Sequence, residues 1–280
     1  MSKRIFCSRR VLSYMGSDSD RRRIKSADKV CDILEHLRTV GTSTVSEISE
    51  AIELSPGTTH TYLATLESRG LVRQDEGSSE YRLGLELLPY GDHVRVRNEF
   101  YRAAEAEIQQ LAHDSGAYAH LMTEHNGRLI ILQETFGENA IGTDFHPRKR
   151  ERPEPLLHCT ATGKAILAHL PDYRVANILH ERDLVSHTSS TITEKDELVA
   201  ELETIRERGF ALNDQEHMRG IRAVGTPVLS DDGRVLGAVS LSGSASNWSG
   251  DRFREEVPKT VMRTANAIEV NVHSNLDETS

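Results

Sequence analysis

Two helix starts follow each other closely in residues 44–70, and their spacing is the strongest constraint on the fold. Thr44-Val45-Ser46-Glu47 matches a capping box, in which a hydroxyl residue precedes a glutamate by three positions. Ser55-Pro56 then supplies a second N-cap, followed by the proline that favours the first helical position. The first helix must therefore be short and must turn at once into the second. Gly70 provides a C-terminal stop for that second helix.

A further helix is expected before this pair, and a hairpin after it. Apolar residues recur at helical spacing across residues 26–40, with Ser26 as the expected N-cap. Three helices with a tight connection between the last two form a helix-turn-helix. Two strand-like runs, 71–74 and 80–83, flank a loop that contains glycine, which predicts a hairpin. Residues 25–84 therefore have the pattern of a winged helix-turn-helix, a DNA-binding fold.

The third of these helices has two chemically different faces. Thr59, Leu63 and Leu66 fall on one side, which we expect to pack against the other helices. The opposite side is small and hydroxylated and carries no acidic residue, so it can approach DNA closely, contact thymine methyl groups and donate to phosphates. An ordinary soluble helix would carry Glu and Lys there. The residues expected in the groove are Thr58, His60, Thr61 and Thr65.

Charge is distributed unevenly along the chain. The net charge of −9 alone argues against nucleic acid binding, but residues 1–84 hold 13 Lys and Arg against 12 Asp and Glu, whereas the rest holds 21 against 31. Only the front of the chain is suited to approach phosphates. We expect Arg73 and Arg82 of the hairpin to contact the DNA backbone, although each could equally be a solvated strand charge. Residues 1–24 are expected to be a basic, disordered arm, which is as consistent with solvation as with DNA contact.

Membrane and disulfide-stabilised classes are disfavoured. No window approaches the roughly 18 uninterrupted apolar residues of a membrane span. Arg9 and Arg10 interrupt the apolar stretch that a signal peptide would need, so we expect a cytoplasmic protein. Cys7, Cys31 and Cys159 form no CxxC pair, which argues against a disulfide framework and against a structural zinc site.

The remainder of the chain predicts an α+β domain. Residues 98–116 form a strong helical pattern, after which the period changes to that of strands, and Asn126-Gly127 predicts a hairpin. Further helices are expected at 160–170, 194–208 and 250–272, and further strands at 223–229 and 235–241. The expected architecture is an antiparallel sheet flanked by helices, with a pocket on one face of the sheet.

Seven segments together resemble the IclR family of transcriptional regulators. They are residues 54–66, 70–72, 81–84, 156–168, 209–216, 220–228 and 237–243. The resemblance spans about residues 25–272, and it implies a GAF-like effector domain behind the winged helix. The family often has arginine directly after the histidine of the third helix, where this chain has Thr61. That departure leaves the operator sequence open.

The resemblance implies a division of the chain into successive parts. After the arm at 1–24 come the winged helix-turn-helix at 25–84, a linker at 85–99, a GAF-like ligand-sensing domain at 100–275 and a tail at 276–280. In the family, the segment between the two domains helps to form dimers. A plain amphipathic helix that packs on its own domain is the alternative.

The resemblance also implies a small-molecule site, often for a carboxylate or an aromatic acid, between the sheet and the helix at 160–170. The residues carried over are Ala161, Thr162, Asn213, Ala223, Ser240 and Ser242. Hydroxyl groups, an amide and the free N–H groups of a helix N-terminus can together bind an anion. Some relatives carry an acid where Asn213 stands and a thiol where Ala223 stands. Alternatively, Ser240 and Ser242 could lie on a strand face that is turned toward water.

Two other kinds of site have weaker support. Residues 160–165 lack the first glycine and the final hydroxyl of a phosphate loop, which argues against nucleotide hydrolysis. His158 and Cys159 could join His217 in a metal or catalytic site, but adjacent side chains on a strand point to opposite faces. No metal and no cofactor are therefore expected.

These patterns favour a one-component transcriptional regulator. We expect double-stranded operator DNA and a small-molecule effector, such as an organic acid, as its partners. We further expect a homodimer or tetramer whose operator affinity changes when the effector binds. The alternative is a small-molecule enzyme or sensor built on the C-terminal domain, with the N-terminal helices used only for assembly. No carboxylate pair or complete triad is visible to support an enzyme.

Overall fold

The computed structural model describes residues 23–140 and 156–277. The predicted arm at 1–24 lies almost wholly outside this part of the chain, as does most of the predicted tail. The chain divides into two compact units, Met1–Leu87 and Leu88–Ser280. Within the described ranges, no helix combines the length and apolar character needed to cross a bilayer.

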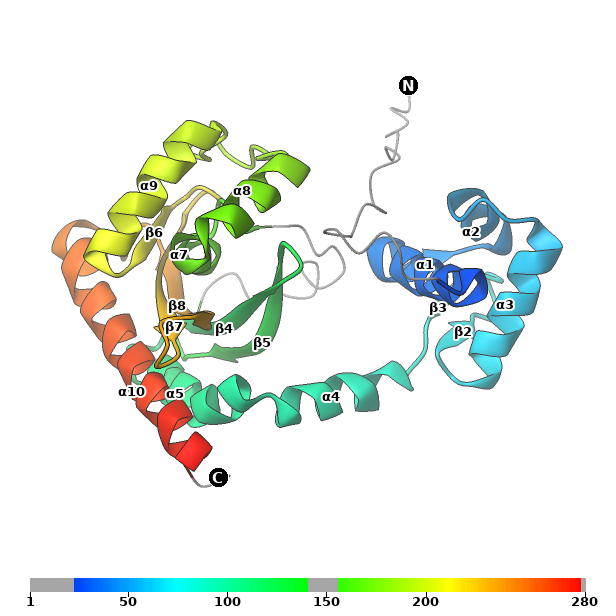
Figure 1. The fold of residues 1–280 in the computed structure, drawn as a ribbon, viewed down its shortest axis with the longest axis horizontal. Coiled ribbons are helices and arrows are strands. Elements are labelled where there is room, and N and C mark those ends of the chain that lie inside the picture. The colour runs from blue at the N-terminus through cyan, green and yellow to red at the C-terminus, as the bar shows by residue number, and fades with distance from the viewer. Residues whose placement is uncertain (1–22, 141–155, 278–280) are drawn as a thin grey trace. The chain divides into compact units, whose positions relative to one another are not determined.

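In the described residues 23–86, the first unit has three helices and a small antiparallel sheet (Figure 1). Its elements are α1 (Lys25–Val40), β1 (Thr42–Ser43), α2 (Val45–Ala51), α3 (Pro56–Ser68), β2 (Val72–Gln74) and β3 (Tyr81–Leu83). The strands are arranged in the order β1-β3-β2. The predicted helix-turn-helix and hairpin are confirmed, and β1 adds a third strand that the sequence did not predict.

The starts of α2 and α3 follow from local sequence. The Glu47 N–H donates to Thr44 Oγ1 at 3.3 Å, and the Thr44 N–H donates to Glu47 Oε2 at 2.8 Å, so the capping box is formed. The Thr58 N–H donates to Ser55 Oγ at 3.2 Å, with Pro56 at the helix start. These bonds satisfy backbone donors that a helix end would otherwise leave unpaired.

The start of α1 differs from the prediction. The helix begins at Lys25, its N-cap position makes no side-chain cap bond, and Ser26 lies inside the first turn, so the predicted Ser26 cap is wrong. Asp28 lies in the first turn of the helix, where negative charge is favourable, and it forms an ion pair with Arg23 at 2.7 Å. The core that these helices share with the wing consists of Ile33, Leu37, Ile48, Ile52, Leu63, Leu66, Val72 and Tyr81.

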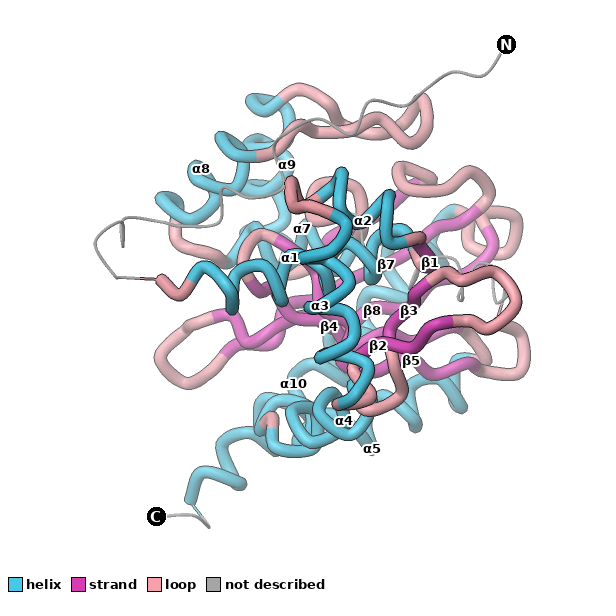
Figure 2. Tube along the Cα trace, turned by 90° about the vertical axis from the view of Figure 1, so that its right-hand side faces the viewer, coloured by secondary structure: helices cyan, strands magenta, loops and turns pink. Residues whose placement is uncertain are grey.

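The described part of the second unit has a five-stranded antiparallel sheet with helices on both faces. Its strands are β4 (Tyr118–His125), β5 (Arg128–Phe136), β6 (Ala211–Asp214), β7 (Ile221–Leu229) and β8 (Val235–Ser244), in the order β5-β4-β8-β7-β6. Its helices are α5 (Glu99–Ser115), α7 (Ala161–His169), α8 (Asp172–Glu181), α9 (Lys195–Arg208), the π-helical turn η2 (Arg252–Glu256) and α10 (Val257–Asp277). Figure 2 shows α5 and α10 on one side of the sheet and α7, α8 and α9 on the other. The predicted α+β class is confirmed.

A further helix, α4 (Leu87–Arg97), occupies most of the segment that was expected to be a linker. Its side chains are not buried in this structure. The longer helix α5 follows directly, with Asn98 as its N-cap. Two regular elements in the rest of the chain, α8 and β6, were also not predicted.

The hairpin between β4 and β5 sets which residues share a face of the sheet. Asn126-Gly127 forms its turn with φ angles of 56° and 70°, both in the left-handed region that a two-residue hairpin turn requires. A β-bulge between Leu121 and Met122 then shifts the register by one residue. As a result His120 lies opposite Glu134.

Candidate functional site

The exposed face of α3 carries the residues predicted to enter a DNA groove. Thr59 and Leu63 are fully buried, as predicted. Thr58, Thr61 and Thr65 are exposed and follow one side of the helix, and His60 is exposed beside them. The structure therefore brings the four predicted groove residues together on one accessible surface.

The hydroxyl groups on this face already have partners within the first unit. Thr61 Oγ1 donates to the Gly57 carbonyl at 3.1 Å, and Thr65 Oγ1 donates to the Thr61 carbonyl at 2.9 Å. Thr58 Oγ1 is bonded to Ser55 Oγ at 2.9 Å. In the free chain, the hydroxyl protons of Thr61 and Thr65 are therefore directed at carbonyl groups of their own helix. In this arrangement, the two threonines present methyl groups and oxygen lone pairs, which suit thymine methyl groups and base amino groups.

The wing presents two positive charges side by side. Arg73 on β2 pairs directly with Arg82 on β3, and both side chains are exposed. Among the described residues, neither arginine has a carboxylate within ion-pair distance. Their direct pairing also places two like charges opposite each other, which destabilises a pair of strands. Both guanidinium groups are therefore available for an anionic partner such as a phosphate.

The predicted effector residues of the strands lie on one face of the large sheet. Asn213, Ala223 and Ser242 form a row across β6, β7 and β8, and Ser240 lies in the next row, opposite Gly225. Directly paired residues, and residues two apart along a strand, point to the same side of a sheet. We call this side the effector face.

The first turn of α7 touches the effector face. A Cβ atom added to Gly225 would lie 2.6 Å from the Ala161 carbonyl carbon and 2.9 Å from the Thr162 nitrogen. The absence of a side chain at this position thus lets the helix start reach the sheet. Thr162 Oγ1 lies 3.4 Å from Ser240 Oγ. The structure therefore joins the two predicted helix residues to the four predicted strand residues.

The effector face is largely removed from solvent. Ser240 is 2% exposed, and Ser242 is half-buried, so the alternative that both serines face water is wrong. Asn213 Oδ1 accepts from the Glu216 N–H at 2.8 Å. Within the described residues, the Asn213 Nδ2 and the backbone N–H groups of Ala161 and Thr162 have no acceptor. These groups make the effector face rich in hydrogen-bond donors.

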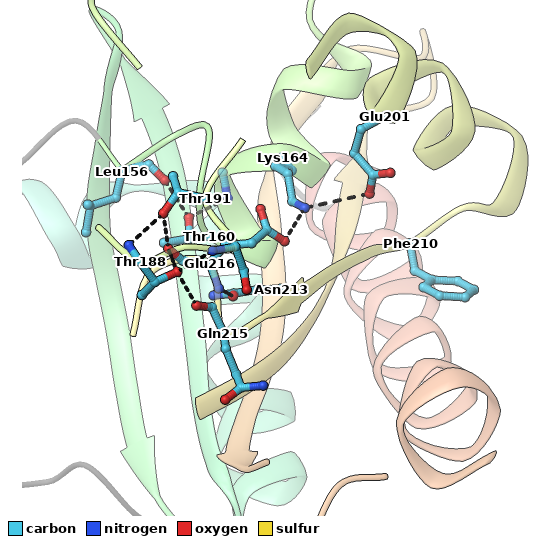
Figure 3. Close-up of polar contacts among 12 residues, drawn as sticks. Leu156, Thr160, Lys164, Thr188, Thr191, Glu201, Phe210, Asn213, Gln215 and Glu216 are labelled. Atoms are coloured by element: carbon cyan, nitrogen blue, oxygen red, sulfur yellow. Dashed lines mark hydrogen bonds and ion pairs between the residues drawn. The ribbon is translucent and has the colours of Figure 1, made fainter. Parts of the chain in front are cut away.

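A separate cavity of about 420 Å³ opens at the β6 edge of the sheet. Lys164, which is 1% exposed, lines it and donates to Glu216 at 2.7 Å, with Glu201 at 3.6 Å (Figure 3). Burial raises the pKa of Glu216, although the neighbouring Lys164 acts in the opposite direction. None of the six predicted effector residues lines this cavity.

Comparison with known protein families decides between a regulator and the alternatives. A family model described as "Bacterial transcriptional regulator IclR C-terminal" matches residues 93–270, and one described as "IclR helix-turn-helix domain" matches residues 26–76. The chain belongs to the IclR family. It is therefore a transcriptional regulator with a helix-turn-helix DNA-binding domain and a C-terminal effector-binding domain.

Individual IclR relatives match over almost their whole length. A protein of Halobacterium salinarum named "Probable HTH-type transcriptional regulator ArcR" is 36% identical, with 92% of this chain and 97% of the relative covered. The crystal structure of an IclR regulator from Alicyclobacillus acidocaldarius is 26% identical, with a TM-score of 0.75 and coverage of 90% and 100%. An IclR homolog from Microbacterium hydrocarbonoxydans, complexed with 4-hydroxybenzoate, is 18% identical, with a TM-score of 0.72 and coverage of 89% and 99%. The relatives are named regulators, so the enzyme alternative is not supported.

This IclR regulator has further polar residues on its effector face that sequence reasoning missed. His120, only 6% exposed, lies opposite Ser240 in the sheet, and its Nε2 is 3.1 Å from Ser242 Oγ. Its Nδ1 is 3.4 Å from Glu134 Oε1, to which the Tyr118 hydroxyl also donates. Alternation along β4 could have suggested His120, but the bulge that pairs it with Glu134 leaves no signal in the sequence.

The sequence argument against a shared site at His158 and Cys159 was wrong. These residues lie in a turn directly before α7 and not on a strand, so their side chains need not diverge. The ligand atoms of His158, Cys159 and His187 all lie within 4.8 Å of one another. The ring of His217 stands edge-on to that of His187, with centroids 5.4 Å apart. Burial lowers the pKa of His158, which favours the neutral form of its imidazole.

Proposed function

We propose that this IclR regulator binds operator DNA with the exposed face of α3 in the major groove and the wing on the backbone. The observation that carries the proposal is the acid-free row Thr58, Thr61 and Thr65 on the exposed side of α3. Arg73 and Arg82 are exposed and form no ion pair among the described residues, which supports backbone contact by the wing. His60, on the same exposed surface, has two ring nitrogens that can donate or accept hydrogen bonds at base edges.

We propose that the effector is a small organic acid held on the effector face. Ala161, Thr162, Asn213, Ala223, Ser240 and Ser242 are the proposed contacts. The free N–H groups at the start of α7, the amide of Asn213 and the serine hydroxyls supply donors without a large buried positive charge. The 4-hydroxybenzoate complex of the Microbacterium homolog is consistent with a carboxylate effector.

We propose that the regulator acts in the cytoplasm as a homodimer or tetramer on a nearly palindromic operator. The apolar residues of α4 support self-association, because they are more than half exposed in the single chain, as Leu88, Tyr90, Val94 and Val96 show. Effector binding would then shift an equilibrium between two arrangements of the assembled protein that differ in operator affinity.

The experiment is fluorescence anisotropy of labelled DNA from upstream of the protein's own gene, titrated with the full chain over a series of salt concentrations. We expect saturable binding. The logarithm of the association constant should fall linearly with the logarithm of the salt concentration. A thermal-shift screen of sugar acids, keto acids and aromatic acids identifies effector candidates. An acid that raises the melting temperature should also change the DNA affinity. Absence of binding to this DNA at every salt concentration would contradict the proposal.

A further inference from the structure

Three potential metal ligands converge in the second unit, at a place that the proposed effector site does not use. The Nδ1 or Nε2 atoms of His158 and His187 and the Sγ of Cys159 lie within 4.8 Å of one another. His158 and Cys159 are buried, and His187 is half-buried. Two of the three side chains are therefore shielded from solvent, and the third is partly accessible.

The donor atoms indicate which ions the group can bind. A thiolate and two imidazoles are soft and borderline ligands, which suit zinc and neighbouring transition metals and do not suit magnesium or calcium. Ligand atoms around a tetrahedral zinc ion lie about 3.5 Å apart, given metal–ligand distances of about 2.0–2.3 Å. Small side-chain rotations would close a spacing of up to 4.8 Å to this distance.

The surroundings of His158 fix which nitrogen can bind a metal. His158 Nε2 lies 3.0 Å from the carbonyl oxygen of Val185. A carbonyl can only accept, so the proton must be on Nε2, and Nδ1 keeps the lone pair that a metal needs. Metal-binding histidines commonly donate their second ring nitrogen to a backbone carbonyl in this way.

The loop that carries His187 is anchored to the end of β6. The His187 N–H donates to Thr191 Oγ1 at 3.0 Å, and that hydroxyl donates to the Glu216 carbonyl at 2.6 Å. Thr188 Oγ1 donates to the Gln215 carbonyl at 2.7 Å (Figure 3). These bonds hold the His187 backbone near the turn before α7 without a metal, so little ordering entropy remains to be lost when an ion binds.

We propose that the C-terminal domain binds one zinc-class divalent ion through His158 Nδ1, Cys159 Sγ and one ring nitrogen of His187. Three protein ligands leave the fourth tetrahedral position to water. The Cys159 thiol releases its proton to solvent when the sulfur–metal bond forms, and the metal keeps its oxidation state. The bound ion would hold the turn before Thr160 in one conformation. Metal binding would therefore also affect the start of α7 at Ala161. This inference does not depend on the DNA-binding proposal.

The test is a titration of the full, chelator-treated chain with cobalt(II) chloride, monitored by absorption spectroscopy. We expect one equivalent to bind, with a thiolate-to-cobalt charge-transfer band and the intense visible bands of a tetrahedral site, and we expect zinc to displace it. Cys159→Ser should lose the charge-transfer band, and Cys31→Ser, which changes an exposed thiol in the first unit, should keep it. His187→Gln should weaken cobalt binding by more than about tenfold, because even the loss of a partner outside the ligand set costs roughly 10–100-fold in metal affinity. His125→Gln, at an exposed histidine, should leave it unchanged.

Circular dichroism of the metal-free variants shows whether each is folded. If Cys159→Ser does not fold, His187→Gln decides the question, because His187 lies on a partly exposed loop. A wild-type chain without the charge-transfer band would overturn the proposal. So would a band that persists in Cys159→Ser, or equal cobalt affinity of the wild type and His187→Gln.

Discussion

At the scale of single residues, Gly57 on α3 has no explanation within the free protein. A Cβ atom there would meet nothing within 4 Å, and no left-handed backbone angle requires glycine. Glycine costs helix stability relative to alanine, so its presence on the proposed groove face is consistent with close approach of DNA.

Gly57→Ala should therefore weaken operator binding without destabilising the protein. We expect the free energy of unfolding to stay level or to rise by at most about 1 kcal/mol, while the added methyl group reduces operator affinity. Urea denaturation and anisotropy measure the two effects. Glu203→Ala, at an exposed position of the helix α9 in the second unit, is the control, and it should leave DNA affinity unchanged. Equal operator affinity of Gly57→Ala and the wild type would contradict the expectation.

Asp214 provides a prediction on pH. Arg222 donates to both of its carboxylate oxygens, at 2.7 and 3.0 Å, and these hydrogen bonds hold the pKa of Asp214 below its ordinary value of 3.8. A lowered carboxylate pKa stabilises the folded state above the ordinary value, and this contribution is lost as the pH falls through the folded-state pKa. The stability difference between the wild type and Asp214→Asn should thus be largest above pH 3.8 and should narrow below it.

Thermal melting across acidic pH measures this difference. Solvent screening keeps the effect small, because the Asp214 side chain is 42% exposed. Asp183→Asn, at an exposed aspartate, is the control for the loss of one surface carboxylate. If the melting temperatures of the wild type and Asp214→Asn differ by the same amount at every pH, the ion pair with Arg222 is not the cause of the stability difference.

At the scale of elements, the contact between α7 and β7 depends on Gly225. An added methyl group would lie within 3 Å of the backbone of Ala161 and Thr162, where no flexible side chain can yield. Gly225→Ala should move α7 off the sheet and destabilise the second unit by about 1–3 kcal/mol. Chemical denaturation measures the loss of stability. Unchanged stability would contradict the direct helix–sheet contact.

The wing gives a prediction on salt dependence. Removing one phosphate contact by Arg82→Gln should weaken binding about equally for all DNA sequences. It should also reduce the slope of the logarithm of the association constant against the logarithm of the salt concentration by about 1. It also relieves repulsion from Arg73, its partner across the strands, so the fold should not lose stability. Arg234→Gln, at an exposed arginine paired with Asp232 in the second unit, should change neither quantity. A salt slope that Arg82→Gln leaves unchanged would exclude the phosphate contact.

Elements with strong local signals could be predicted, and those stabilised by distant contacts could not. The capping box at Thr44 and the Asn126-Gly127 turn act through neighbouring residues, so the sequence reveals them. β1 consists of only two residues and exists because it pairs with β3. β6 is a four-residue edge strand that pairs with β7 alone, and nothing in its own pattern distinguishes it from a loop.

The same distinction applies to the sites. The proposed groove residues of α3 were predicted from helical periodicity, and the proposed effector residues of the strands came from the family resemblance. His120 was missed although alternation along β4 could have suggested it, and only its pairing with Glu134 depends on the bulge beside Leu121. The His158, Cys159 and His187 group was missed because a turn was taken for a strand and because His187 is distant in sequence. Only the folded chain brings these residues together.

At the scale of the whole molecule, coupling between effector and operator must be reciprocal. If an organic acid lowers operator affinity by a given factor, operator DNA must lower the affinity for that acid by the same factor. This relation holds for a homodimer or a tetramer alike, since it concerns equilibrium affinities only.

The most direct measurement is operator affinity of Thr61→Glu, which places a negative charge at the centre of the exposed face of α3. Against DNA phosphates this charge should cost several kcal/mol, which lowers affinity at least about 100-fold. Thr39→Glu is the matched control, because Thr39 is an exposed helical threonine on α1 with the same type of hydroxyl-to-carbonyl bond. Any acid that raises the melting temperature of the wild type should do so equally in both variants. Operator affinity of Thr61→Glu equal to that of Thr39→Glu would contradict the placement of α3 against DNA.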